Sequence, residues 1–244
     1  MSHDLDDTRP NLSRREWREQ LAAARSPFGG PAAVDAMSSP EGSETPVTIL
    51  TVCTGNICRS PMAEVLLRAR LRDLGVRVHS AGTHALVGHG MTPQAQEIAV
   101  QRGAREADAS AHAARYLVEP LLMESDLVIT MTREHRSHVV QMVPQLMKRA
   151  FPVREFARLA ATLTTDEARA AADAAGGDVH ARVRAALRAV TDQRGKTPAD
   201  QSNDDVIDPY RRSGEVYEQS ANELLPALDE VERILRAALE KQRN

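Results

Sequence analysis

The stretch Val47-Thr48-Ile49-Leu50-Thr51-Val52-Cys53-Thr54-Gly55-Asn56-Ile57-Cys58-Arg59-Ser60-Pro61 decides the fold of this chain. Its first six residues are β-branched or apolar without regular alternation, which is typical of a strand buried on both faces of a parallel sheet. The residues from Cys53 onward form a short loop, and Met62 to Leu71 then carry apolar side chains at helical spacing. A strand, a loop and a helix N-terminus make an anion-binding site, because successive backbone N–H groups converge on one ligand.

The first and seventh residues of the loop distinguish it from a nucleotide-binding loop. Cys53 lies at the mouth of the predicted ring of amides, where a guanidinium and a helix N-terminus favour a thiolate, so we predict that it is a nucleophile. Arg59 offers a planar fork of donors that matches two phosphoryl oxygens. The residues between them are expected to present backbone amides to the phosphate: Thr54, Gly55, Asn56, Ile57 and Cys58. This arrangement suits phosphoryl transfer, which depends mainly on positioning and charge stabilisation, and we expect it to need neither a metal nor another cofactor.

Two compatible roles are open for Ser60. It donates its hydroxyl to the Cys53 thiolate and eases the departure of that thiolate in a second step, or it caps the helix before Pro61.

The run from Val52 to Pro61 resembles the signature of the low-molecular-weight protein tyrosine phosphatases, and this signature is far more specific than Cys-x5-Arg alone. The resemblance implies that the thiolate accepts the phosphoryl group while an Asp in a C-terminal Asp-Pro-Tyr motif protonates the leaving phenol. Water then hydrolyses the phosphocysteine with the same Asp as base. The chain has this motif at Asp208-Pro209-Tyr210, where Tyr210 is expected to flank the substrate ring or to brace its loop. Asp204 and Asp205 are nearby rivals for the acid, and only the resemblance selects Asp208.

Composition and charge exclude several functional classes. Aromatic residues make up only 3% of the chain against 42% hydrophobic residues, which predicts an aliphatic core. A formal net charge of −3 indicates neither a nucleic-acid-binding nor a membrane-binding surface, and no apolar run approaches the ~20 residues of a membrane span. The acidic start lacks the features of a signal peptide, and both cysteines lie in the predicted catalytic loop. We therefore expect a cytoplasmic protein.

The alternation of strands and helices predicts an α/β fold, a three-layer sandwich with a four-stranded parallel sheet and helices on both faces. Strands are expected at residues 47–52, 76–83, 126–131 and 151–153, with the catalytic loop at their C-terminal edge. Residues 1–45 contain breaker-rich segments and are predicted to be a disordered N-terminal extension, whereas residues 46–244 form the phosphatase domain that the resemblance implies.

Helices are predicted at residues 93–102, from 109 with a break to 124, at 133–140 and at 215–242. His135 and His138 could share a face of the third of these helices. Because a third ligand is missing, we expect a solvated face there and no metal site.

Residues 164–203 depart from the family pattern, which passes from the fourth strand to the acid loop by a short connection. Two Ala/Arg-rich helices, Thr165 to Asp173 and His180 to Arg188, are expected in this insertion. We favour inert padding over a lid that contacts protein substrates.

The resemblance also bears on the substrate. Leu86 and Val87 occupy a cleft wall where some family members place an aromatic residue. In this the chain resembles the bacterial members that act on autophosphorylated tyrosine kinases of polysaccharide export. A protein arginine phosphatase of the same fold is the nearest alternative, but a Thr tends to replace Ile57 in those relatives. An arsenate reductase would need more cysteines than the two present, and intact Cys53, Arg59 and Asp208 argue against an idle phosphotyrosine-binding module. We further hypothesise that Cys53 and Cys58 form a protective disulfide on mild oxidation.

Overall fold

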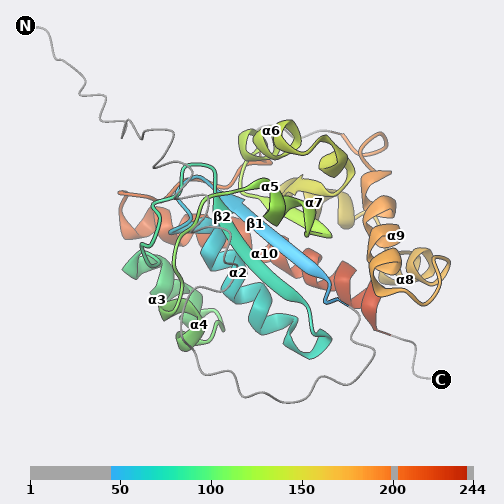
Figure 1. Ribbon diagram of the computed structural model, residues 1–244, viewed down its shortest axis with the longest axis horizontal. Helices are drawn as coiled ribbons and strands as arrows, with labels where there is room; N and C mark the ends of the chain where they lie inside the picture. Colours follow the sequence, from blue (N-terminus) through green and yellow to red (C-terminus); the bar gives the residue numbers. More distant parts are fainter. Residues whose placement is uncertain (1–44, 199–202, 241–244) are drawn as a thin grey trace, which may run out of the picture. The chain divides into compact units, whose positions relative to one another are not determined.

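A four-stranded parallel sheet forms the centre of the computed structural model, which describes residues 45–198 and 203–240 (Figure 1). The strands are β1 (Thr48–Cys53), β2 (Arg77–Gly82), β3 (Leu127–Thr130) and β4 (Ala150–Pro152). They lie in the order β2-β1-β3-β4, and each neighbouring pair is parallel. Every residue of β1 is buried, as its uninterrupted β-branched and apolar sequence predicts.

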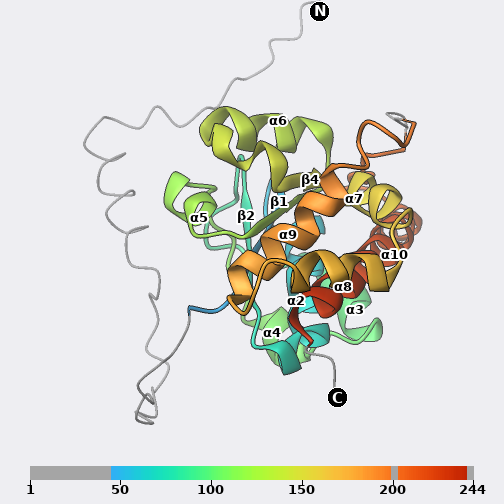
Figure 2. The same ribbon diagram turned by 90° about the vertical axis from the view of Figure 1, so that its right-hand side faces the viewer.

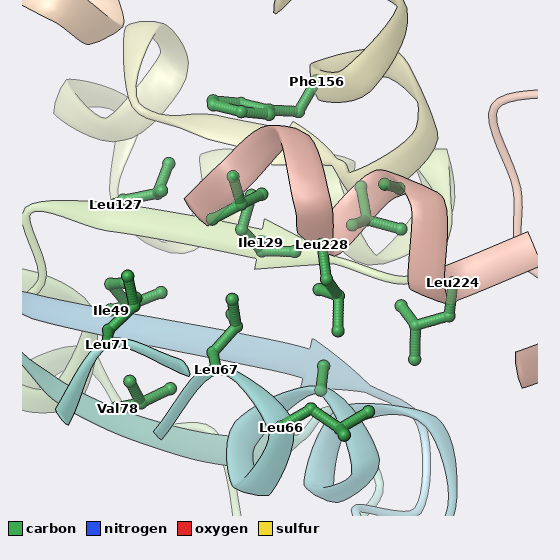
Figure 3. Packing of buried hydrophobic residues seen from close by; sticks show 14 of the residues in the cluster. Ile49, Leu66, Leu67, Leu71, Val78, Leu127, Ile129, Phe156, Leu224 and Leu228 are labelled. Carbon is green, nitrogen blue, oxygen red and sulfur yellow. The ribbon is translucent and has the colours of Figure 1, made fainter. Parts of the chain in front are cut away.

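Helices cover both faces of the sheet, so the predicted three-layer architecture is confirmed. One face carries α2 (Arg59–Arg70), α7 (Val153–Ala160) and α10 (Gly214–Leu239), and the other carries α5 (Glu119–Met123), α6 (Arg133–Met142) and the short helix η2 (Pro144–Lys148). Successive residues of β1 alternate between the two layers, since Ile49 belongs to the first core and Leu50 to the second. Figure 3 shows the first core. Leu66 and Leu67 of α2 point toward Leu228 of α10, and Ile49 of β1 belongs to the same cluster.

Five further elements lie outside these layers or extend them: η1 (Arg72–Leu74), α3 (Pro93–Gln101), α4 (Glu106–Ser110), α8 (Thr165–Asp173) and α9 (Val179–Thr191). The α8 and α9 helices pack against each other and against α10 (Figure 2). Their buried residues join the first core: Ala168, Ala172, Val183, Ala186, Leu187 and Val190. The two helices expected at 165–173 and 180–188 are therefore present, and they pack into the main core.

The prediction of a helix that begins at Ala109 is wrong. The α4 helix ends at Ser110, and residues 112–118 are not helical, with Tyr116 in a parallel bridge to Gly82 at the end of β2. The N–H of Gly82 donates to the carbonyl of Arg115 at 2.9 Å, and the N–H of Leu117 donates to the carbonyl of Gly82 at 2.8 Å. Pairing with the end of β2 thus overrides the helical propensity of the alanines here.

The last helix, α10, ends at Leu239 and is shorter than the predicted span to residue 242. Residues 241–244 and the predicted disordered extension, except for its last residue, lie outside the described part of the chain. Within that part, every helix is too short or too polar to span a membrane.

Candidate active site

The loop after β1 surrounds the sulfur of Cys53, the last residue of that strand. Cys53 is buried, and its Sγ lies 3.0 Å from Ser60 Oγ and 3.3 Å from the backbone N–H of Asn56, which donates to it. Asn56 has a φ of 56°, the left-handed conformation that Asn tolerates better than most residues. The α2 helix has no side chain bonded at its N-terminal cap, so of the two roles open for Ser60 the structure shows the contact with Cys53.

A buried polar network holds Asn56 in this conformation. Its Nδ2 donates to Ser60 Oγ at 3.0 Å and to Ser80 Oγ at 2.7 Å, and its Oδ1 accepts from the backbone N–H of Arg115 at 2.9 Å. The carbonyl oxygen of Asn56 lies 2.8 Å from His112 Nε2. This network fixes the loop from behind, and sequence reasoning missed Ser80, Arg115 and His112 because they come from separate segments of the chain.

Glu64 closes the same network on α2, where it is 6% exposed. Ser80 Oγ donates to its Oε2 at 2.5 Å, and Arg68 forms an ion pair with its other oxygen. Burial raises the pKa of Glu64, but the bonds from His112, Arg68 and Ser80 outweigh it and hold the pKa below its usual value. A lone carboxylate on a buried helix face was the available sequence signal for this residue.

Arg59 joins the loop to the distant Asp208. Its side chain is 5% exposed, its Nη1 donates to the carbonyl of Val206 at 3.1 Å, and its Nη2 lies 2.7 Å from Asp208 Oδ2. The Nε of Arg59 is buried and has no hydrogen-bond acceptor among the described residues. One N–H of the guanidinium is therefore unpaired within the described part of the chain.

The acid loop distinguishes Asp208 from its two rivals. Asp204 is buried in an ion pair with Arg158 at 3.0 Å, and Asp205 accepts the backbone N–H of Arg133 at 2.7 Å. Both carboxylates therefore hold the loop in place. Asp208 instead has a side chain that is 52% exposed and accepts the backbone N–H of Tyr210 at 3.1 Å. The loop is also tied to the sheet, since the N–H of Val206 donates to the carbonyl of Met131 at 2.9 Å.

A pocket of about 270 Å³ lies over Cys53. Its lining consists of Cys53, Thr54, Gly55, Ile57, Cys58, Arg59, His84, Leu86, Asp208, Tyr210 and Arg211. All predicted site residues are among them except Asn56 and Ser60, which are buried behind the loop. His84 and Arg211 were not predicted. Leu86 lines the pocket as expected, whereas Val87 does not, and no residue of α8 or α9 belongs to the lining.

Cys58 has different surroundings from Cys53, although both thiols are free. Its Sγ lies 3.4 Å from Thr92 Oγ1 and 3.6 Å from the hydroxyl of Tyr217. Burial raises the pKa of the Cys58 thiol, and burial likewise raises the pKa of Tyr217 to about 12.

The prediction that His135 lies on a solvated helix face is wrong. His135 is 6% exposed, with its Nε2 2.9 Å from Thr54 Oγ1 and its Nδ1 2.8 Å from Thr132 Oγ1. Burial and the nearby Arg59 lower the pKa of His135 to about 4. The imidazole is therefore neutral near pH 7 and joins α6 to the loop.

Comparison with known proteins gives a consistent result. Residues 48–168 match the family model described as low molecular weight phosphotyrosine protein phosphatase. The low molecular weight protein-tyrosine-phosphatase Etp of Escherichia coli strain K12 is 42% identical over 99 residues, which cover 41% of this chain and 64% of Etp. The match thus spans less than two thirds of the length of that relative.

Two other similarities extend over more of the chain. The protein-arginine-phosphatase of Bacillus subtilis strain 168 is 29% identical over 197 residues, which cover 80% of this chain and 98% of that protein. The crystal structure of a low molecular weight protein tyrosine phosphatase from T. tengcongensis is similar with a TM-score of 0.51 and 29% identity, covering 76% of this chain and 97% of that one.

Proposed function

We propose that this chain, which belongs to the low molecular weight phosphotyrosine protein phosphatase family, hydrolyses phosphotyrosine in proteins through a phosphocysteine intermediate. One observation carries the proposal: a single pocket contains the Cys53 thiol, the Arg59 guanidinium with an unpaired Nε, and the Asp208 carboxyl group. These groups are separated by about 150 residues of sequence at the widest, and a nucleophile, an anion clamp and an acid are what a two-step phosphoryl transfer requires.

In the first step, Cys53 Sγ attacks phosphorus while the bond from phosphorus to the phenolic oxygen breaks. The free Nε of Arg59 and the loop amides from Thr54 to Arg59 stabilise the charge on the equatorial oxygens. Asp208, carrying a proton, passes it to the leaving phenolate. Its ion-pair contact with Arg59 places the carboxyl group beside the same phosphoryl site.

In the second step, Asp208 removes a proton from water, which attacks phosphorus and releases phosphate and the Cys53 thiolate. The hydroxyl of Ser60, 3.0 Å from Sγ, stabilises the sulfur as it leaves. Asn56 and the network behind it hold the loop in the geometry that both steps share.

The pocket walls suit an aromatic substrate. Leu86 and Ile57 supply apolar contact, and Tyr210 stands at the mouth with 39% of its surface exposed, where it flanks a phenyl ring. The substrate we propose is a tyrosine-phosphorylated protein. More specifically, we propose an autophosphorylated bacterial tyrosine kinase of polysaccharide export. Two free cysteines in the pocket fit a reducing cytoplasm. Substrate trapping with Cys53→Ser from lysate tests the kinase, since recovery of other phosphoproteins alone would contradict it.

Steady-state kinetics on a phosphotyrosine peptide test the activity. Cys53→Ser should abolish turnover, and Asp208→Asn should lower kcat by about 10²- to 10⁴-fold, the usual contribution of a general acid. Asp205→Asn is the matched control, because Asp205 lies three residues earlier but binds Arg133 outside the pocket; its kcat should stay within about tenfold of the parent. Equal losses in the two Asp variants would refute the role of Asp208.

A protein arginine phosphatase is the second candidate, and the full-length similarity to the Bacillus subtilis arginine phosphatase favours it. Parallel measurement of kcat/KM on phosphotyrosine and phosphoarginine peptides of one sequence decides between them. We expect the phosphotyrosine peptide to be preferred, and a preference for phosphoarginine would reverse the assignment.

A further inference from the structure

Arg211 is an exposed arginine at the rim of the pocket, one residue beyond Tyr210. Its guanidinium carbon lies 5.1 Å from the centre of the Tyr210 ring. Among the residues that the structure describes, Arg211 forms no ion pair and no side-chain hydrogen bond. The ring contact therefore restrains the guanidinium without neutralising its charge.

Three other arginines near the acid loop serve to hold the fold together. Each is paired with a carboxylate: Arg133 with Asp205, Arg154 with Glu223, and Arg158 with Asp204. Within the pocket, the charge of Arg59 is offset by Asp208 at 2.7 Å. Arg211 thus contributes an uncompensated positive charge at the mouth of the pocket.

The backbone at Arg211 gives a second, independent indication. Its φ is 60°, and the N–H of Arg212 donates to the carbonyl of Pro209 at 3.0 Å, so Arg211 is the third residue of a tight turn. Gly or Asn is favoured where such a turn needs a positive φ, and a long L-residue there costs free energy. Strain of this kind clusters at functional sites, and this turn lies in the loop that carries Asp208.

We propose that Arg211 determines substrate specificity by binding an anionic group, a carboxylate or a second phosphate, that lies beside the phosphotyrosine in the protein substrate. This inference rests on the proposed phosphatase function. A phosphotyrosine held over Cys53 places the side chains of its neighbouring residues at the rim, since each residue spans only ~3.5 Å of chain. The planar fork of Arg suits both kinds of anion.

Three phosphotyrosine peptides of one sequence test the proposal, with the flanking positions occupied by Gln, by Glu or by a second phosphotyrosine. The enzymes compared are the parent, Arg211→Asn and Arg212→Asn. Asn tolerates the positive φ at position 211, so the turn is kept. Arg212 is the matched control, because it is also exposed and is adjacent to Arg211 but does not line the pocket.

The parent should show a kcat/KM about two- to fivefold higher for at least one anionic peptide than for the Gln peptide at low salt, which is the size of an exposed ion pair. This ratio should fall toward one in Arg211→Asn, persist in Arg212→Asn and shrink at high salt. The peptide that shows the preference identifies the anion as carboxylate or phosphate.

A parent ratio of one, or an equal loss of the ratio in both variants, overturns the specificity role while leaving the phosphatase function intact. Failure of the parent to hydrolyse any of the three peptides overturns the phosphatase function, and this inference with it. The kcat/KM on the Gln peptide therefore reports the proposed function, and the ratio between peptides reports the role of Arg211.

Discussion

At the scale of single residues, the two cysteines of one loop have opposite environments. Cys53 Sγ accepts the N–H of Asn56 and lies against Ser60 Oγ, whereas Cys58 Sγ lies beside the hydroxyls of Thr92 and Tyr217. Burial raises the pKa of Cys58, so at neutral pH it stays a thiol. The raised pKa keeps Cys58 reduced and unreactive in the resting protein, while its place in the lining of the same pocket as Cys53 puts it near an oxidised form of that residue.

Mild peroxide should therefore inactivate the enzyme reversibly. Oxidation converts the Cys53 thiolate to a sulfenic acid, and the Cys58 thiol then displaces water from it to form a disulfide. We expect dithiothreitol to restore most activity in the parent but little in Cys58→Ser, where oxidation proceeds to sulfinic acid. Recovery of aryl-phosphatase activity measures the effect.

Tyr217→Phe serves as the control for this experiment, because it keeps both thiols and removes only the hydroxyl 3.6 Å from Cys58. It should recover like the parent. Equal recovery in the parent and Cys58→Ser would show that Cys58 protects nothing.

The sequence allowed the prediction of those site residues that share a local motif. Cys53 and Arg59 follow from the strand, loop and helix around them, but Asp208 was selected over Asp204 and Asp205 only by family resemblance. The structure gives the physical reason for that selection, since the rivals are engaged with Arg158 and Arg133. Arg211 and His135 could not be predicted, because their roles depend on which distant segment packs against them.

At the scale of elements, local signals predicted the helices that carry their own caps. The α8 helix begins with a capping box between Thr164 and Glu167, and α9 is capped by Asp178, whose carboxylate accepts two backbone N–H groups. Residues 111–118 lack such local control, because their backbone pairs with β2 and the loops beside it. Predictions failed where tertiary contacts override propensity.

The packing of α8 and α9 also bears on how to test whether the insertion at residues 164–203 is a lid over protein substrates. Deleting residues 165–197 would uncover the α7 and α10 surfaces that these helices cover, so lost activity would report unfolding. None of the pocket lining comes from these helices, and this gives the lid alternative no support within the described chain.

A point substitution separates stability from catalysis. Leu187 on α9 is 1% exposed, and Leu187→Ala should lower the free energy of unfolding by about 2 to 5 kcal/mol through lost burial and a residual cavity. The kcat/KM on a phosphotyrosine peptide should stay within about twofold of the parent below the melting transition, because no α9 residue reaches the pocket. Urea unfolding and steady-state kinetics measure the two effects.

Arg188→Ala is the neighbouring control, since Arg188 is exposed on the same helix and its unfolding free energy should change by about 0.5 kcal/mol or less. A drop in kcat/KM for folded Leu187→Ala would instead favour coupling between α9 and the active site.

At the scale of the whole molecule, two histidines join segments that are distant in sequence: His135 is buried and His180 is partly buried. His180 of α9 lies 2.9 Å from Asp126 Oδ1, and its Nε2 lies 2.9 Å from the carbonyl of Thr45, so it ties the insertion to the entries of β1 and β3. The hydrogen bond to Asp126 raises the pKa of His180. Burial has the opposite effect on His135 and lowers its pKa to about 4.

These two histidines should make stability fall on both sides of neutral pH. A raised folded pKa means that the His180 contribution is complete below the ordinary value of 6.5 and is lost as pH rises through the folded pKa. A lowered folded pKa means that His135 opposes folding below 6.5, because the unfolded chain takes up a proton that the folded chain takes up only near pH 4.

Substitution by Gln should therefore give opposite pH dependences, measured as free energies of unfolding in urea. His180→Gln should lose more stability relative to the parent at about pH 6 than at about pH 9, since the ion pair with Asp126 exists only when His180 is charged. His135→Gln should be destabilised most near pH 7, where the neutral imidazole bonds Thr54 and Thr132, and the difference from the parent should narrow toward about pH 5. A pH-independent loss in both variants would show that neither histidine links protonation to folding, and the histidines would then stabilise the protein through packing alone.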